Sequence, residues 1–114
     1  MMQKKNHLKL NPLQLRTLAL FQELARLPQF STPVPDSDDV FLSTLPHPHG
    51  DHFHVGAKVA LSKDATGLGN QSVWVALERK GLIRPAFPYA LTLTKAGLDY
   101  DTSMSGLTLY GSDH

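Results

Sequence analysis

The chain has 114 residues, 41% of them hydrophobic, which predicts a single domain over residues 1–114 with one modest core. Eleven Lys and Arg against ten Asp and Glu give a net charge of +1, which argues against a strongly basic nucleic-acid-binding protein. The lack of cysteine excludes disulfides and thiolate zinc sites. With no secretory signal, and no apolar run near the roughly 20 residues of a transmembrane helix, we expect a soluble cytoplasmic protein without membrane contact.

The first predicted element is a helix from Pro12 to about Leu27, which Pro28 ends. Asn11 can cap its start, and Gln14 can complete a capping box. Its apolar side chains exceed one stripe: Leu13, Leu15, Leu18, Leu20, Phe21, Leu24, Ala25 and Leu27. The helix therefore serves either the core alone or the core together with a dimer contact. We expect residues 1–9 and 103–114 to be flexible or dimer-contacting tails, and the second tail can instead add an edge strand.

An inserted β-hairpin is predicted after this helix. Residues 28–39 contain prolines and then acids, which is typical of a loop. The run from Val40 to Leu45 has strand character, and apolar residues alternate from Phe53 to Val59. We expect this second strand to pair back on the first.

A helix-turn-helix is predicted next. Ser62 can cap a short helix containing Ala65, and residues 67–69 (Gly-Leu-Gly) form the turn. Asn70 can cap a second helix, which ends at Gly81. Ile83 then opens a strand, residues 88–89 turn, and residues 90–94 return as a second strand. Thr94 can cap a last short helix from Lys95 to about Tyr100.

Three fragments of this region resemble the winged helix-turn-helix family. They are Ala65 to Leu68 with Asn70 to Val73, then Ala76 to Ile83 (ALERKGLI), then Leu91 to Gly97 (LTLTKAG). Their order is typical of bacterial members. The resemblance implies an α+β fold, a winged helix-turn-helix with an N-terminal helix and an inserted β-hairpin. It also implies a small transcription-regulator-like protein that binds duplex DNA, and half-site geometry favours a homodimer.

The predicted DNA-contacting residues lie on and beside the second helix. Residues 58–95 hold six Lys and Arg against two acids, a local charge of +4, whereas residues 36–57 hold four Asp and no Lys or Arg. Gln71 suits a bidentate contact with adenine, and basic side chains nearby suit phosphate. The predicted interface is Lys63, Asn70, Gln71, Ser72, Val75, Arg79, Lys80, Arg84 and Lys95.

Some features favour a protein-interaction module of the same fold, which is the alternative function. The second helix is short, the wing (residues 84–89) has one basic residue, and Glu78 sits among the groove-facing candidates. A fold of this kind does not by itself specify DNA binding. Trp74 is expected at the edge of the core, with surface recognition as the other possibility.

A histidine-rich string supplies a second alternative. Residues 47–52 read H-x-H-x-D-H, which resembles the metal-binding signature of the metallo-β-lactamase family, where histidines and an aspartate hold zinc. That fold needs a much longer chain and distant ligands, so we expect neither an enzyme nor a cofactor. A simpler zinc site remains an alternative, with ligands from His47, His49, Asp51, His52 and His54; the other possibility is a solvated polar turn.

Overall fold

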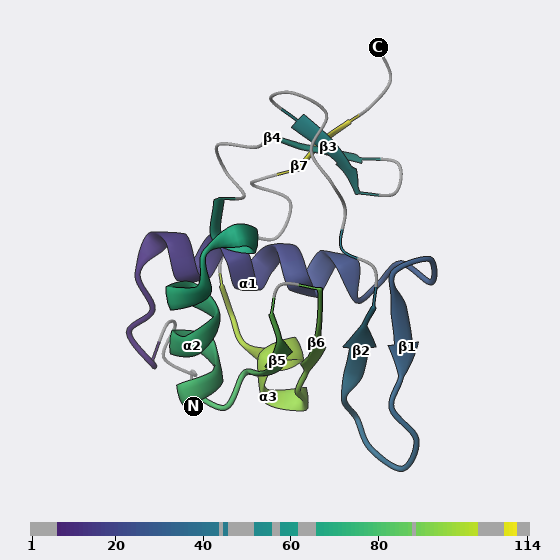
Figure 1. The fold of residues 1–114 in the computed structure, drawn as a ribbon, viewed down its shortest axis with the longest axis vertical. Coiled ribbons are helices and arrows are strands. Elements are labelled where there is room, and N and C mark those ends of the chain that lie inside the picture. The colour runs from purple at the N-terminus through teal and green to yellow at the C-terminus, as the bar shows by residue number, and fades with distance from the viewer. Residues whose placement is uncertain are drawn as a thin grey trace.

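The computed structural model describes residues 7–43, 45, 52–55, 58–61, 66–87, 89–102 and 109–111. Within them the chain is α+β (Figure 1). The helices are α1 (Pro12–Leu24), the 3-10 helix η2 (Thr66–Gly69), α2 (Gln71–Arg79) and α3 (Lys95–Asp99). The strands are β1 (Ser31–Pro33), β2 (Val40–Leu42), β3 (His52–Val55), β4 (Lys58–Leu61), β5 (Ile83–Ala86), β6 (Ala90–Leu93) and β7 (Leu109–Gly111).

Local signals set the ends of α1. The Gln14 amide donates to Asn11 Oδ1 at 2.8 Å, and the Asn11 amide donates to Gln14 Oε1 at 3.0 Å, so the predicted capping box is confirmed. The helix ends at Leu24, three residues earlier than predicted. After Leu24 the Leu27 amide donates to the carbonyl three residues earlier, at Leu24, instead of four residues earlier. The α-helix does not continue because the residue before Pro28 is disfavoured in helical geometry.

The apolar side chains of α1 are used inside one chain. Every residue from Thr17 to Phe21 is buried, and so is Leu24. In Figure 1, α1 runs between the four-stranded sheet with its helices on one side and the three-stranded sheet on the other. The apolar excess of this helix therefore gives no independent support to a dimer contact.

The larger sheet is antiparallel, with strand order β1-β2-β6-β5. Leu42, Leu91 and Leu93 point to the core, while Phe41 and Thr92 pair on the outer face. The structure corrects the loop predicted for residues 28–39, because part of it forms β1 and pairs with β2. Period-two patterning did not reveal this three-residue edge strand, which holds no buried residue.

The predicted hairpin between residues 40–45 and 53–59 is also wrong. β2 pairs with β1 and β6, whereas β3 pairs with β4 in a separate sheet of order β3-β4-β7. Only two residues separate β3 from β4, a common hairpin connection, and the apolar alternation continues in phase across them. The pattern therefore cannot distinguish one long strand from two short ones. In the second tail, residues 109–111 form the edge strand that was one of the predicted possibilities, paired with β4.

The predicted second helix, hairpin and last helix are confirmed. Gly81 has a positive φ of 76° and closes a Schellman motif, with the Gly81 amide on the Glu78 carbonyl at 2.9 Å and the Leu82 amide on the Leu77 carbonyl at 3.0 Å. β5 and β6 form the hairpin, and Thr94 caps α3. Residues 67–69 belong to η2 rather than to an open turn, and the short helix predicted from Ser62 through Ala65 lies outside the described residues.

Among the described helices, none combines the length and apolar character that crossing a bilayer requires.

Candidate nucleic-acid interface

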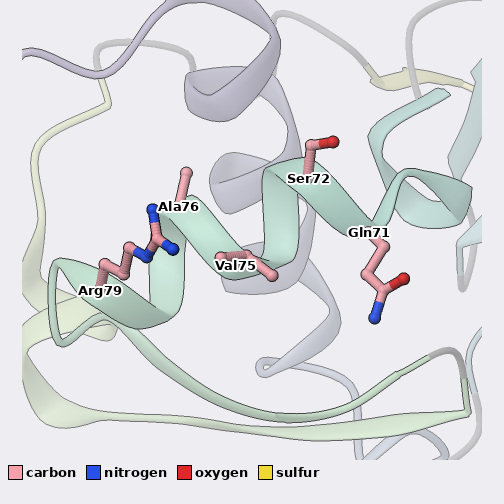
Figure 2. A pocket seen from close by; sticks show the side chains of 5 residues that line it. All are labelled: Gln71, Ser72, Val75, Ala76 and Arg79. Carbon is pink, nitrogen blue, oxygen red and sulfur yellow. The ribbon is translucent and has the colours of Figure 1, made fainter.

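The helix α2 is buried on one side and exposed on the other. Val73, Trp74 and Leu77 enter the core. The other side, called here the outer face of α2, forms a shallow hollow of about 400 Å³ lined by Gln71, Ser72, Val75, Ala76 and Arg79. Figure 2 shows these side chains along one side of the helix, with α1 behind it. Four of the nine predicted DNA-contacting residues therefore lie together: Gln71, Ser72, Val75 and Arg79.

Trp74 holds α2 in place from the buried side. Its side chain is 0% exposed, so surface recognition by Trp74 is wrong, and it lies within the core rather than at its edge. The indole Nε1 donates to the Gly67 carbonyl at 3.1 Å. The ring meets Phe21 and Phe87 edge-on, with centroid distances of 5.5 and 4.9 Å. One residue thus fixes α2 to η2, to α1 and to the β5–β6 hairpin.

Asn70 caps α2 and is engaged within the chain. Its Oδ1 accepts the Ser72 amide at 3.0 Å, as an N-cap side chain does. Sequence reasoning missed Ala76, which lines the hollow but carries no polar group. Its position four residues after Ser72, on the same helical face, was the available signal. Glu78 is exposed and does not line the hollow. It follows Val75 by three residues, so its carboxylate lies beside the outer face and still counts against DNA binding.

Lys80 lies at a different hollow, of about 350 Å³. This second hollow is lined by His7, Leu8, Lys80, Leu82, Ala96, Asp99 and Tyr100, and it shares no residue with the first. Neither Arg79 nor Lys80 forms an ion pair with another described residue. Lys63 lies outside the described residues.

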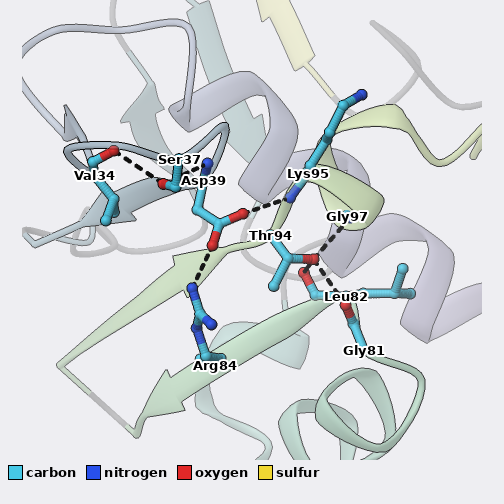
Figure 3. A network of polar contacts seen from close by, with 9 residues as sticks. All are labelled: Val34, Ser37, Asp39, Gly81, Leu82, Arg84, Thr94, Lys95 and Gly97. Atoms are coloured by element: carbon cyan, nitrogen blue, oxygen red, sulfur yellow. Dashed lines mark hydrogen bonds and ion pairs between the residues drawn. The ribbon is translucent and has the colours of Figure 1, made fainter.

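Arg84 forms an ion pair with an acidic residue of the segment 36–57, which the sequence analysis treated as separate from the basic segment 58–95. Its guanidinium on β5 forms an ion pair with Asp39, which lies 45 residues earlier at the end of the β1–β2 loop. Figure 3 shows Asp39 between Arg84 and the backbone of Lys95, whose amide donates to Asp39 Oδ1 at 2.9 Å. The sequence counted Asp39 only as part of an acidic segment, since nothing local links it to residue 84.

Lys95 is also paired. Its Nζ lies 2.5 Å from Asp99 Oδ2, one helical turn ahead on α3. The hydrogen bond to Asp99 and the charge of that carboxylate raise the pKa of Lys95 above its ordinary value. The ammonium therefore stays charged throughout the neutral range, but acids of the same chain offset it and Arg84. Two of the predicted phosphate contacts thus add less free positive charge than the sequence count indicates.

The predicted zinc ligands fall mainly outside the described residues. This is true of His47, His49 and Asp51, whereas His52 and His54 lie on β3, opposite Leu61 and Val59. Within the described residues, no group of three or more potential ligands is placed to hold a metal ion. The zinc site stays a prediction.

Comparisons with protein-family models, with curated proteins and with solved structures find no match to this chain.

Proposed function

We propose that this chain is a small winged helix-turn-helix protein that binds duplex DNA through the outer face of α2. Its role is that of a cytoplasmic transcription regulator, without catalytic activity and without a required cofactor. The observation that carries the proposal is the grouping of Gln71, Ser72, Val75 and Arg79 on one exposed helical face. This exposed face is not needed for the core, because the opposite face of α2 already supplies Val73, Trp74 and Leu77.

The diameter of α2 suits this role. A helix with its side chains is about 10–12 Å across, and the major groove of B-DNA is about 12 Å wide. The 9 residues of α2 offer a short contact length, about 14 Å at 1.5 Å per residue. Gln71 lies at the N-terminal end, where side chains of a recognition helix reach base edges. Its carboxamide can donate to and accept from adenine at once. The β5–β6 hairpin runs beside the helix, and the Trp74–Phe87 contact holds the two together.

The available charge predicts modest, salt-sensitive binding. Arg79 on α2 and Lys80, which directly follows α2, form no ion pair with another described residue. Each phosphate contact makes affinity fall about 3.5-fold for a fourfold rise in salt. Two such contacts predict a loss of roughly 10-fold between about 50 and 200 mM salt, well below the roughly 100-fold that four contacts would give.

Fluorescence anisotropy with random-sequence duplex DNA at these two salt concentrations tests the proposal. We expect Arg79→Gln to reduce the salt effect to about 3.5-fold, because one phosphate contact is lost. The matched control is Arg26→Gln, which removes the same charge beyond the C-terminal end of α1, away from α2 in Figure 1. Glutamine at position 26 can still donate to Glu23, the present partner of Arg26. Equal effects of the two variants would contradict a specific role for the outer face of α2.

A protein-interaction module is the second candidate, and exposed aromatic side chains favour it. Tyr89 on the β5–β6 hairpin is 79% exposed, Phe41 on the outer sheet face is 37% exposed, and Arg84 nearby is paired with Asp39. Exposed aromatic side chains are typical of protein interfaces. Absence of DNA binding at tens of micromolar by wild-type protein and by its variants would favour this candidate.

The DNA-binding form that we propose is a homodimer, because paired recognition helices read two half-sites. We expect light scattering at tens of micromolar to give twice the chain mass of 12.6 kDa. A mass of one chain, both free and with DNA present, would contradict the dimer and leave single-site binding.

A further inference from the structure

Hydrogen bonds to residues other than Arg84 hold Asp39 in place. Its Oδ1 accepts the Lys95 amide at 2.9 Å, its backbone amide donates to Ser37 Oγ at 3.1 Å, and its carbonyl accepts the Val34 amide at 3.1 Å. The Ser37 hydroxyl in turn donates to the Val34 carbonyl at 2.9 Å. The side chain is 16% exposed. These bonds orient Asp39 independently of Arg84, as Figure 3 shows.

Unlike Asp39, Arg84 is accessible to solvent. Its side chain is 65% exposed and projects from the outer face of β5, the strand that directly follows α2. A guanidinium binds carboxylate and phosphate with the same donor geometry. Bound to Asp39 through Nη2, the guanidinium has its charge offset locally and one of its nitrogens engaged. A phosphate of bound DNA would compete with that carboxylate for the guanidinium.

We propose that Asp39 acts as an internal competitor of DNA phosphate, which keeps Arg84 out of the DNA interface and weakens binding. This inference rests on the proposed DNA-binding function. The surface involved comprises the end of the β1–β2 loop and the start of β5, and its ligand is the phosphate backbone. Asp39 lowers affinity for all sequences alike, because phosphate contacts carry no base information.

The test is Asp39→Asn, measured by anisotropy with random-sequence duplex DNA. Asparagine keeps an oxygen for the Lys95 amide, but it releases Arg84 because its NH₂ group is a donor. We expect one added phosphate contact, so the affinity loss between about 50 and 200 mM salt grows about 3.5-fold relative to wild type. The matched control is Asp36→Asn, which removes the same charge from the same loop. Asp36 has a φ of 60°, which asparagine tolerates, and we expect its salt dependence to equal that of wild type.

A second arm removes Arg84. Arg84→Gln is expected to reduce the salt effect about 3.5-fold in the Asp39→Asn background, and to reduce it less in the wild-type background than Arg79→Gln does. This wild-type comparison holds even if Asp39→Asn proves unstable by circular dichroism. Equal reductions by Arg84→Gln and Arg79→Gln in wild type would overturn the inference, because Arg84 would then already contact phosphate. An Asp39→Asn salt dependence equal to that of Asp36→Asn would overturn it as well.

These outcomes separate the inference from the function beneath it. Salt-dependent binding by wild type that Asp39→Asn leaves unchanged removes the competitor and keeps the DNA-binding proposal. No binding by any of the proteins at about 50 mM salt removes both. Binding by Asp39→Asn alone, with none by wild type or Asp36→Asn, supports the inference and identifies Asp39 as the residue that suppresses binding, but it contradicts the proposed DNA binding by the wild-type chain.

Discussion

Trp74→Ala is expected to lower the free energy of unfolding by about 3–5 kcal/mol, the range for deleting a buried aromatic side chain. The side chain is fully buried and contacts Phe21 and Phe87 edge-on, so its removal leaves a cavity between α1, α2 and the hairpin. The indole hydrogen bond to the Gly67 carbonyl is lost as well, although that carbonyl still accepts the Asn70 amide at 3.2 Å. Because small domains are stable by only about 5–15 kcal/mol, the change removes a large share of the stability, and at the low end of that range it leaves the variant partly unfolded at room temperature.

Urea denaturation followed by far-ultraviolet circular dichroism measures this effect, since Trp74 is the single tryptophan and its fluorescence disappears in the variant. The control is Tyr89→Ala, another aromatic-to-alanine change on the β5–β6 hairpin. Tyr89 is 79% exposed, so we expect a change within about 0.5 kcal/mol. Similar stability losses in the two variants would contradict the central packing of Trp74.

Gly67→Ala is expected to destabilise the protein by about 1–3 kcal/mol through overpacking. A Cβ on Gly67 would lie 1.8 Å from Thr17 Oγ1 and 3.0 Å from Thr17 Cβ, so η2 and α1 would have to separate. Gly69 provides a matched control within the same 3-10 helix, because a Cβ there meets nothing within 4 Å. We expect Gly69→Ala to stay within about 0.5 kcal/mol of wild type in urea denaturation.

A double variant identifies the contact responsible. Thr17→Ala removes Oγ1 and the methyl group that would crowd the new Cβ, so Gly67→Ala should cost less in the Thr17→Ala background than alone. Thr17→Ala by itself gives up the bond from its hydroxyl to the Leu13 carbonyl at 2.8 Å. Additive losses, or equal losses in Gly67→Ala and Gly69→Ala, would show that the close approach of η2 to α1 is wrong.

Trp74→Ala and Gly67→Ala both bear on the proposed DNA binding, although neither residue belongs to the outer face of α2. Gly67 accepts the Trp74 hydrogen bond and also sits where η2 touches α1, so one small region sets the position of α2. The orientation of Gln71 and Arg79 relative to the hairpin follows from that position. Interior packing thus orients a surface that is otherwise defined by exposed polar residues.

Helix α2 shows how far the sequence predicts the candidate site. Helical spacing alone groups Gln71, Ser72, Val75 and Arg79, because side chains one turn apart share a face whatever the helix packs on. A count of charge along residues 58–95 treats each cation as free. Helical spacing can predict the pairing of Lys95 with Asp99, four residues later on α3. It cannot predict the pairing of Arg84 with Asp39, which lie close together because β2 and β5 both pair with β6.

Local sequence signals predict the starts of α1, α2 and α3, the end of α2, and the β5–β6 hairpin. Asn11 with Gln14, Asn70, Gly81 and Thr94 act on backbone groups within a few residues of themselves, so their effect does not depend on the rest of the fold. Three features depend on contacts between distant segments: β1 is a strand, β2 pairs with β6, and Asp39 forms an ion pair with Arg84. These contacts join segments far apart in the chain, and they form because burial of Leu42, Leu91 and Leu93 brings the two hairpins into one sheet.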